Sequence, residues 1–458
     1  MIAMMSRLRC VRGLLACALI FIGVPSAYAK SNSDWDLAEE IVAGIQLPSI
    51  PDREFSILDF GAVADADVHP AISQAIAAAV QAGGGRIVIP RGNWVSHGPV
   101  VLHSKIELHL AKGALLKFSP EPADYLPVVK SRWEGTELYT YSPLIYAAGV
   151  EDVAITGTGT IDGNADSAFK QWHPKQNADM QRLRKMGAGG VPVEERIFGE
   201  GTFLRPPLVQ FFGAKRVLLK DFTALNSPFW VNHLIYTDHA TVQRIRVDSH
   251  FFNNDGIDIE SSSNVLLENS WFRTGDDSVV VKSGRDLDGR TIGIPSRRIV
   301  VRNNDMGGED GIALGSEMSG GISDVFFTDN LLRKGVSAFR FKANLDRGGL
   351  VENIHLRNLE VESFENLFWF QLNYPGELGG FFPSIYREIV FENIQVKEVG
   401  TFLEVHAPDA APLKDVVFRG INVEQVQTPL VIENAVNLEF DEVKLGDQRI
   451  DGVLSWRK

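Results

Sequence analysis

The chain has 458 residues, of which 45% are hydrophobic and 22% are charged, and its formal net charge is −13. This composition is ordinary for a globular protein with a sizeable core, and the negative charge argues against non-specific nucleic-acid binding. An anionic substrate would therefore need a local basic site on this acidic chain.

Residues 1–29 have the pattern of a secretory signal peptide. A basic front precedes an apolar run over 14–24, and residues 27–29 read Ala-Tyr-Ala, which is an A-x-A cleavage site. The run is too short to span a membrane, and its removal takes both cysteines with it. We therefore expect an exported chain, in the periplasm or outside the cell, without a membrane anchor, a disulfide or a cysteine-ligated zinc ion.

Residues 30–52 are polar and contain proline, so we interpret them as a linker to one domain over 53–458. Residues 55–61 predict a strand that ends at Gly61. Pro70 then opens an Ala-rich amphipathic stretch to Ala82, which predicts a helix with proline in its first turn. We expect this helix to cap one end of a stack of strands, because bare strand edges would otherwise be exposed.

A short sequence pattern recurs from about residue 100 onward, and it consists of an apolar strand, a polar turn and another strand. Its irregular period, roughly 22–35 residues, fits the coils of a β-solenoid with loops of varied length. A jelly roll or sandwich would instead favour two-residue hairpin turns, which the sequence lacks. Examples of this sequence pattern are residues 216–220, 241–245, 264–268, 298–302, 324–328, 353–357, 388–392 and 415–419.

Two long stretches interrupt this rhythm, and we interpret both as irregular loops. Residues 164–205 are polar, charged and glycine-rich, whereas residues 365–386 are rich in aromatic side chains. Long loops in a repeat protein are often functional, and aromatic rings suit the apolar faces of sugars. Burial on the solenoid wall explains each aromatic residue equally well. The aromatic residues are Phe368, Trp369, Phe370, Tyr374, Phe381 and Phe382.

Three carboxylates in residues 253–283, Asp255, Asp276 and Asp277, lie beside glycines at the ends of apolar–polar alternations. Asp255 and Asp276 are about one solenoid coil apart, and successive coils are about 4.8 Å apart, so the three acids should meet. A cluster of like charges resists full ionisation, which supplies an acid and a base for glycoside hydrolysis. A lone Asp at a corner would more often cap a turn, and Asp258 and Glu260 are interpreted as supporting residues.

Several further motifs resemble the polygalacturonases and their relatives, family 28 of the glycoside hydrolases. Asn254-Asp255-Gly256 matches the family's N-T-D motif with Asn in place of Thr, and Gly275-Asp276-Asp277 matches its second acidic motif. Arg340-Phe341-Lys342 matches its R-I-K motif. The stretches 58–63, 133–146 and 226–230 resemble the first strand of the family and its bacterial members.

The resemblance implies an all-β fold, a right-handed parallel β-helix, and hydrolysis by a single displacement with inversion. It implies that Asp276 is the general acid and that Asp255 and Asp277 activate water. Arg340 and Lys342 would then bind the carboxylate of the sugar, Arg with two hydrogen bonds and Lys as a point charge. No metal or cofactor is required. A solvated strand face is the alternative interpretation of the two basic residues.

One motif departs from the family pattern. The usual G-H-G is replaced by Gly308-Glu309-Asp310, so that Glu309 stands where His is expected. We hypothesise that Glu309 faces the cleft and raises the pKa of Asp276. The rhamnogalacturonan-cleaving branch also lacks this His, while residues 315–321 resemble bacterial exo-acting polygalacturonases. His233 and Lys282 complete the predicted substrate-binding set, although a lone His is more often structural.

The sequence thus predicts an exported, monomeric hydrolase of pectic polysaccharide that releases galacturonic acid from chain ends. Residues 164–205 could wall off one end of its cleft. A rhamnogalacturonan hydrolase of the same family is the main alternative. A lyase that holds Ca²⁺ in the acidic cluster and a non-catalytic sugar-binding β-helix are less favoured. Three adjacent acids would repel an anionic ligand in a pure binding groove.

Overall fold

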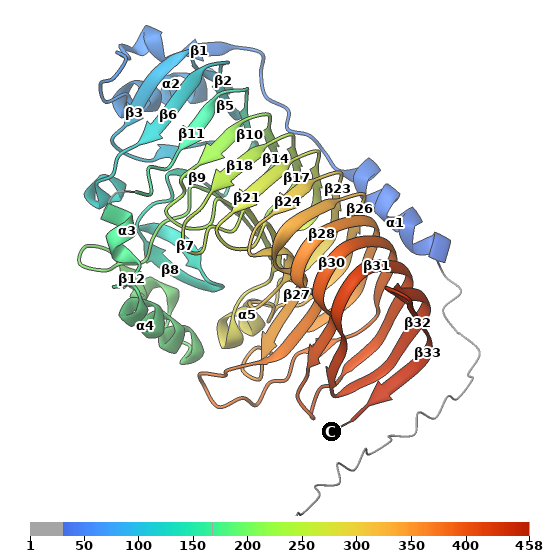
Figure 1. Ribbon diagram of the computed structural model, residues 1–458. Helices are drawn as coiled ribbons and strands as arrows, with labels where there is room; N and C mark the ends of the chain where they lie inside the picture. The colour runs from blue at the N-terminus through green and yellow to red at the C-terminus, as the bar shows by residue number, and fades with distance from the viewer. Residues whose placement is uncertain (1–30, 167, 458) are drawn as a thin grey trace, which may run out of the picture.

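The computed structural model describes residues 31–166 and 168–457 of the chain (Figure 1). Strands of successive coils pair in parallel along one axis, which confirms the predicted right-handed parallel β-helix. The predicted signal peptide lies outside the described residues. Within them, no helix is both long enough and apolar enough to cross a membrane.

Each of the first coils contributes one strand to each of three faces. The first face is formed by β4 (Val100–Val101), β9 (Ile145–Ala148), β13 (Val209–Phe212), β16 (Asn232–Ile235), β19 (Ile257–Glu260), β22 (Val279–Lys282) and β25 (Asp310–Leu314). The second is formed by β1 (Glu54–Ser56), β2 (Gly85–Ile89), β5 (Ile106–Leu110), β10 (Glu151–Thr156), β14 (Lys215–Lys220), β17 (Asp238–Gln243), β20 (Ser263–Glu268), β23 (Ser296–Arg302) and β26 (Ile322–Thr328). The third is formed by β3 (Gly92–Ser96), β6 (Ala114–Phe118), β11 (Thr160–Asp162), β15 (Thr223–Leu225), β18 (Arg246–Ser249), β21 (Trp271–Thr274) and β24 (Asp305–Gly307).

Toward the C-terminus the faces are joined by long, bent strands. These are β27 (Leu331–Asn344), β28 (Leu350–Tyr374), β30 (Ile389–His406), β31 (Leu413–Glu433) and β32 (Ala435–Leu445), with the short β29 (Ile385–Tyr386) beside β28. The last strand, β33 (Gln448–Trp456), pairs antiparallel with β32 and ends the stack.

The recurring sequence pattern corresponds to the strands of the second face. Its turn residue adopts the left-handed conformation in coil after coil, as at Asn264 (φ 54°), Asp324 (φ 54°) and Asn353 (φ 56°). Asn and Asp tolerate this conformation better than most residues, which explains why they recur there. The apolar residue that follows is buried in register with its counterparts, so each coil completes the core of the next.

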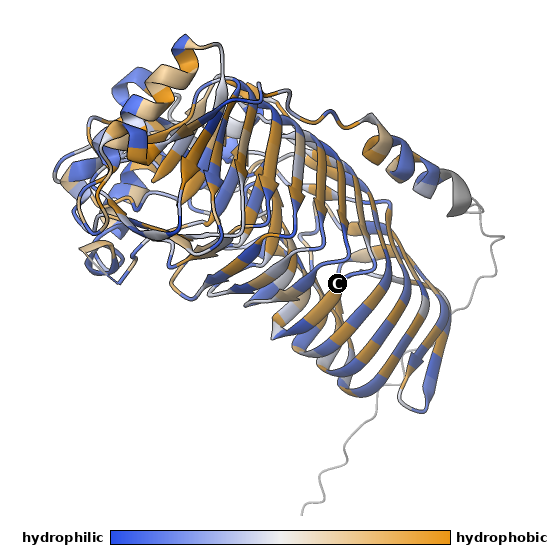
Figure 2. Cartoon of the chain, turned by 90° about the horizontal axis from the view of Figure 1, so that it is seen from above, coloured by the Kyte–Doolittle hydropathy of each residue, from blue (hydrophilic) through white to orange (hydrophobic). Residues whose placement is uncertain are grey.

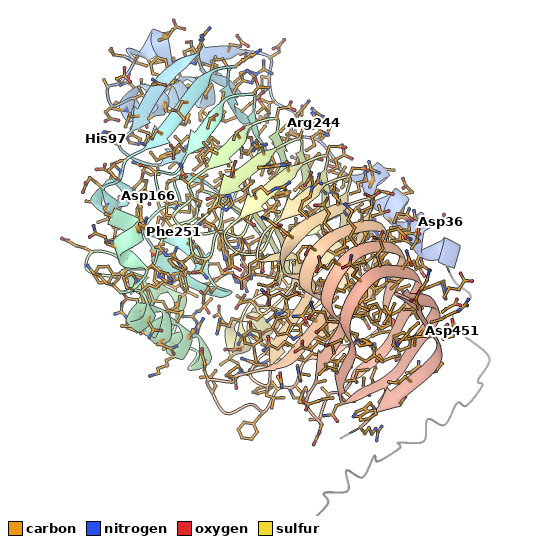
Figure 3. The ribbon with its side chains drawn as sticks, in the orientation of Figure 1. Asp36, His97, Asp166, Arg244, Phe251 and Asp451 are labelled. Atoms are coloured by element: carbon orange, nitrogen blue, oxygen red, sulfur yellow. The ribbon has the colours of Figure 1, made fainter. Side chains whose placement is uncertain are left out.

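The core runs along the inside of the coil, with apolar stripes on successive strands (Figure 2). Phe341 stacks on Phe370 with ring centroids 4.2 Å apart, and Phe339 stacks on Phe368 at 5.3 Å. The prediction of an aromatic loop over 365–386 is therefore wrong for its first half, which belongs to β28. Charged side chains such as Asp36, Arg244 and Asp451 lie on the outer surface (Figure 3).

The predicted cap is helix α2 (His69–Gln81), which packs five buried Ala and Ile side chains against the first strands. The strand predicted over 55–61 is shorter than expected. β1 ends at Ser56, and the 3₁₀ helix η1 (Ile57–Phe60) follows because the Ser56 side chain accepts a hydrogen bond from the Leu58 amide. Gly61, at φ 84°, ends this helix.

The interpretation of residues 30–52 as a linker is wrong over most of its length. Residues Ser31–Gly44 form α1, which lies along the outside of the second face (Figures 1 and 2). Trp35 and Ile41 are buried in a cluster with Leu266, Val300 and Phe326. These outward-facing apolar residues would otherwise be exposed, so α1 covers a hydrophobic patch on the wall.

The stretch 164–205 is not irregular as predicted. It contains α3 (Ala168–Trp172), α4 (Asn177–Ala188), the 3₁₀ helix η3 (Val193–Glu195) and β12 (Ile197–Phe198). A small sheet of β7 (Val129–Trp133), β8 (Thr136–Thr140) and β12 supports these helices, and they gather on one side of the coil (Figure 1). The remaining helices are η2 (Pro122–Tyr125) and α5 (Asp286–Ile292).

Candidate active site

The predicted acids meet on the first face, at the start of neighbouring strands. The pairing of β19, β22 and β25 places Asp255, Asp277 and Asp310 at equivalent positions in three successive coils. Backbone bonds fix this arrangement, because the Gly256 amide donates to the Asp277 carbonyl at 2.9 Å. Asp276 precedes the column by one residue, in the turn. Asp310, which the sequence analysis did not single out as an acid, completes the cluster.

Lys342, from the next coil, lies between two of these acids. Its Nζ is 2.9 Å from Asp277 and 3.0 Å from Asp310. Burial alone would raise the pKa of Asp277, but the charges of Lys342 and Lys282 and the hydrogen bonds to this carboxylate together outweigh burial, and the net effect is a pKa below the usual value. Burial raises the pKa of Asp310 to about 7 despite the same lysine. Asp277 is therefore the acid that stays ionised, as a general base must.

Asp276 has the opposite character. Burial and the neighbouring charge of Asp277 raise its pKa to about 7, even though Lys342 lowers it. Its carboxylate accepts a hydrogen bond from the Asp277 amide at 3.0 Å, and its carbonyl accepts one from the Thr274 hydroxyl at 2.9 Å. The side chain thus retains a proton near neutral pH in a fixed position, as a general acid must.

Asp255 shares its surroundings with Asp258, a fully buried residue of β19. Burial, together with their mutual repulsion, raises the pKa of Asp255 well above its usual value. Lys282 lies 3.8 Å from Asp255 and 3.7 Å from Asp258, and 3.1 Å from Glu317. The single ammonium of Lys282 therefore faces three carboxyl groups. A proton shared by Asp255 and Asp258 reduces the negative charge that Lys282 leaves unbalanced. Asp258 thus belongs to the acidic cluster rather than to the scaffold alone.

Arg340 is presented from β27 beside this cluster. Its guanidinium stacks 3.2 Å from the centroid of Trp369 and donates to Gln371 and to the Tyr374 hydroxyl. These contacts hold the flat guanidinium in one orientation, which favours paired hydrogen bonds to a carboxylate. Lys342, predicted to share this role, also lines the cavity, and it pairs with Asp277 and Asp310.

A cavity of about 510 Å³ encloses these groups. Its lining is strongly polar, with acids and bases from the first face, from α4 and from the loop after β28. The lining residues are Glu134, Arg184, Trp230, Asn253, Asp255, Asp276, Asp277, Lys282, Arg285, Glu309, Asp310, Ser316, Glu317, Arg340, Lys342, Asn344, Arg347, Tyr374, Pro375 and Glu377.

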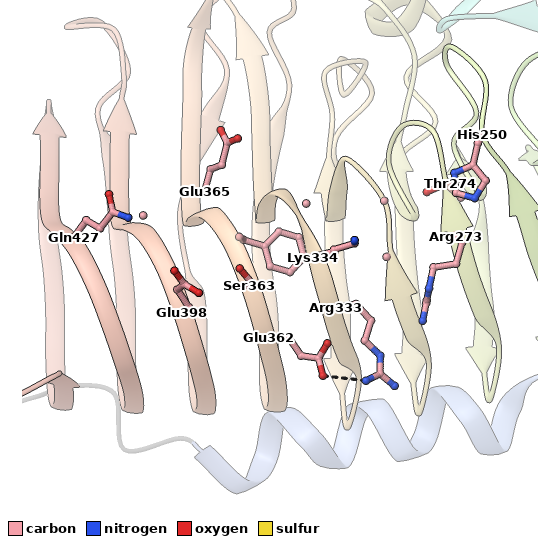
Figure 4. Close-up of a pocket in the computed structure, with 15 residues that line it drawn as sticks. His250, Arg273, Thr274, Arg333, Lys334, Glu362, Ser363, Glu365, Glu398 and Gln427 are labelled. Atoms are coloured by element: carbon pink, nitrogen blue, oxygen red, sulfur yellow. Dashed lines mark hydrogen bonds and ion pairs between the residues drawn. The ribbon is translucent and has the colours of Figure 1, made fainter.

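A larger hollow of about 1050 Å³ lies at the neighbouring corner of the coil (Figure 4). Arg273, Arg333, Glu362 and Glu398 are among its lining residues, and Arg333 donates to Glu362 at 3.0 Å. None of the clustered acids lines it, so we assign the candidate active site to the smaller cavity. No group of three or more His, Cys, Asp or Glu residues in the described ranges is arranged to hold a metal ion.

The comparisons with known proteins agree with this geometry. The family model of the "Glycosyl hydrolases family 28" matches residues 200–440, which is more than half of the chain. The chain belongs to this family. It is therefore a glycoside hydrolase.

Named relatives and solved structures point the same way. A "Probable polygalacturonase" of Vitis vinifera is 30% identical over 366 residues, covering 74% of this chain and 69% of the relative. An exo-poly-alpha-D-galacturonosidase of Dickeya chrysanthemi is 26% identical over 389 residues, covering 77% and 62%. The crystal structure of a hyperthermoactive exopolygalacturonase from Thermotoga maritima superposes with a TM-score of 0.88 at 36% identity, covering 92% of this chain and 99% of that one.

Glu309, at the position where this glycosidase family usually has His, lies on the exposed rim of the cavity. Its amide donates to the Asp276 carbonyl at 3.0 Å. Burial and the charge of Asp277 are larger causes of the raised pKa of Asp276, but the charge of Glu309 acts in the same direction. This agrees with the direction of the hypothesis drawn from the sequence.

His233, which was predicted to bind substrate, does not line the cavity. It is 1% exposed, and its Nε2 lies 2.8 Å from Glu260. Burial lowers its pKa despite this carboxylate. The ring of Trp230, which lines the cavity, lies edge-on to His233 with a centroid distance of 4.8 Å. His233 therefore supports the cavity floor from below.

Several charged residues of the cavity have no counterpart among the sequence-based predictions. Glu134 and Arg184 come from elements outside the coil, and Glu377 comes from the loop after β28. Arg285 and Arg347 follow the acidic strands and contact Glu317 at 3.1 Å and 3.8 Å. Each is a single charged residue in a turn or helix, and only the tertiary fold brings them together.

Proposed function

We propose that this glycoside hydrolase cleaves α-1,4-galacturonosyl linkages of pectic polysaccharide, releasing units from a chain end with inversion. The observation that carries the proposal is the pair Asp276 and Asp277. Burial raises the pKa of Asp276 to about 7, whereas Lys342 keeps Asp277 ionised. Two carboxyls with opposite protonation states supply the acid and the base that glycoside hydrolysis requires.

In this scheme Asp276 gives its proton to the glycosidic oxygen as the bond to the anomeric carbon breaks. Asp277 accepts a proton from water, whose oxygen bonds to that carbon from the opposite face and inverts its configuration. The leaving sugar departs as an alcohol, and a proton must return to Asp276 before the next turnover. Asp255, which shares a proton with Asp258, positions the water beside Asp277.

The basic residues support a galacturonate substrate. Arg340 is held flat against Trp369 and lines the cavity, so its outer N–H groups can pair with the carboxylate of a sugar. The chain as a whole is acidic, and such a residue offsets repulsion of an anionic polymer. The relatives that bear the name polygalacturonase support the same substrate class.

Two features support release from a chain end. The insertion with α3 and α4 lies beside the cavity, and Arg184 of α4 lines it together with the loop that follows β28. The structural relative from Thermotoga maritima, named an exopolygalacturonase, covers nearly the whole chain. A cavity walled on one side by this insertion and loop would admit a chain end more readily than the middle of a polymer.

The lysines favour hydrolysis over Ca²⁺-dependent elimination. The ammonium of Lys342 stands 2.9 Å and 3.0 Å from Asp277 and Asp310, where a cation held by these acids would lie. The other alternative, cleavage of rhamnogalacturonan, is suggested by Glu309 in place of the usual His. The N-terminal pattern of residues 1–29 supports export, and a monomer remains our prediction.

Product analysis on purified polygalacturonate and rhamnogalacturonan tests the proposal. We expect monomeric galacturonate from the first polymer from the earliest time points, and its loss in Asp276→Asn. Products from rhamnogalacturonan alone would transfer the function to the other branch of the family. An unsaturated product that absorbs in the ultraviolet and disappears with chelator would indicate a lyase.

A further inference from the structure

Arg184 joins three segments that are far apart in the sequence. One of its terminal nitrogens lies 2.5 Å from Glu134, in the turn between β7 and β8, and the other lies 2.5 Å from Glu377, in the loop after β28. All three residues line the cavity that holds Asp276. We call this arrangement, Glu134–Arg184–Glu377, the Arg184 bridge.

Both supports of the bridge are fixed by contacts of their own. On one side, Leu183 of α4 is buried in a cluster with Trp133, Phe229 and Trp230. The loop on the other side is held by the buried carboxylate of Asp346. This carboxylate accepts hydrogen bonds from the amides of Glu377, Leu378 and Gly380, at 2.5, 3.0 and 2.7 Å. The bridge therefore connects two preorganised walls, and neither wall needs the bridge in order to fold.

The bridge is also partly shielded from water. The side chains of Arg184 and Glu134 are 16% and 13% exposed, and that of Glu377 is 30% exposed. Arg285 lies beneath, 3.7 Å from both Glu134 and Glu377. Ion pairs in such a network are screened less than pairs on an open surface. A continuous polymer could pass between α4 and the loop only if these contacts were broken.

We propose that the Arg184 bridge is the specificity determinant that closes one end of the cavity and restricts cleavage to chain ends. This inference rests on the proposed function. α4 and the loop after β28 supply the two walls, and the guanidinium of Arg184 joins them. Arg184 acts on the size of the product rather than on the chemical step, which belongs to Asp276 and Asp277.

The test compares the products of wild type, Arg184→Ala and Glu377→Gln on polygalacturonate at low conversion. Arg184→Ala removes the bridge from one wall, and Glu377→Gln removes the charge of its contact on the opposite wall. Arg182→Ala is the matched control, because Arg182 lies on the same helix, is about half exposed and pairs with Asp179 rather than with a residue of the bridge. We expect wild type and the control to release monomer with only a small, measurable share of oligomers. In the two bridge variants the share of oligomers should rise about tenfold, the effect of about 1.4 kcal/mol.

Arg184→Lys keeps the charge but offers one ammonium where the bridge uses two terminal nitrogens, so it should retain more of the monomer pattern than Arg184→Ala and less than wild type, whereas a merely structural role would not follow the charge. Folded and active Arg184→Ala and Glu377→Gln that keep the wild-type share of oligomers would overturn the inference and leave the proposed function intact. Mainly oligomers from wild type at early times would instead refute chain-end release itself, and with it any role of the bridge.

Discussion

Removing the negative charge of Glu309 tests how the cavity sets the protonation of its acid. Asp276 must carry a proton to act as the general acid, so activity should fall as pH rises through its pKa of about 7. Glu309 is among the charges that raise this pKa, behind burial and Asp277. In Glu309→Gln the ionised form of Asp276 is less disfavoured, and the basic limb of the pH–rate profile should move to lower pH.

The exposure of Glu309 sets the size of this displacement. Interactions with exposed charges are worth about 0.2–1 kcal/mol, and one pKa unit corresponds to about 1.4 kcal/mol. Because Asp276 itself is largely desolvated, the upper half of that range applies, which gives a displacement of about half a pH unit. The substitution keeps the size of the side chain, and its position on the rim makes a loss of folding stability negligible.

The assay is kcat/KM on polygalacturonate measured from acid to mildly alkaline pH. Glu365→Gln is the matched control, since Glu365 is also exposed but lines the neighbouring hollow shown in Figure 4. We expect the basic limb to move in Glu309→Gln and to stay in place in the control. An unmoved limb in Glu309→Gln, or an equal movement in both variants, would contradict the assigned role of Glu309.

The remaining predictions concern the ionisation of Asp277, the effect of Asp276 on folding stability, and the packing of the core. Lys342→Met removes the charge that keeps Asp277 ionised, so kcat/KM should fall about 10²–10⁴-fold. The acid limb of the pH profile of this variant should move to higher pH, and an unmoved acid limb would argue against this role of Lys342. The pKa of Asp276 is raised in the folded protein, so folding favours its protonated form. The resulting contribution to stability is fully present below pH 3.8 and is lost as pH rises through about 7. Asp276→Asn should therefore raise the free energy of unfolding at pH 8, by at most about 4 kcal/mol, and a denaturant titration that finds it unchanged or lower would count against the burial argument. Phe341→Ala removes a fully buried ring that stacks on Phe370, and it should lower the free energy of unfolding by about 3–5 kcal/mol; a loss below about 1 kcal/mol would mean that the stack is dispensable.

The sequence predicted the coil and the meeting of its acids because both depend on strand periodicity. The alternation around Asp255 and the Asp276–Asp277 pair indicates strands, and a spacing of about one coil brings equivalent positions together. Asp310 was not predicted because its local sequence, directly after Glu309, does not show which coil position it occupies. The strand pairing, which puts Asp310 in the same column as Asp277, is visible only in the structure.

Other features depended on packing that no local pattern reveals. Helix α1 is polar on its outer side, and the patch that Trp35 covers comes from coils more than 200 residues away. Phe368 and Phe370 have the composition of a sugar-binding loop, but their strand register turns them into the core. His233 lies two coils from Lys282, and its burial under Trp230 follows from the stacking of coils rather than from its neighbours in the sequence.

The central claim is that Asp276 supplies the proton for cleavage of a galacturonosyl bond. Its most direct test is the rate of reducing-end release from polygalacturonate by Asp276→Asn, with Asp221→Asn as control, since Asp221 pairs with Arg244 on the outer surface. We expect the first substitution to reduce kcat by about 10²–10⁴-fold with the fold intact, and the second to leave it unchanged. A folded Asp276→Asn variant that retains the wild-type rate would contradict the account.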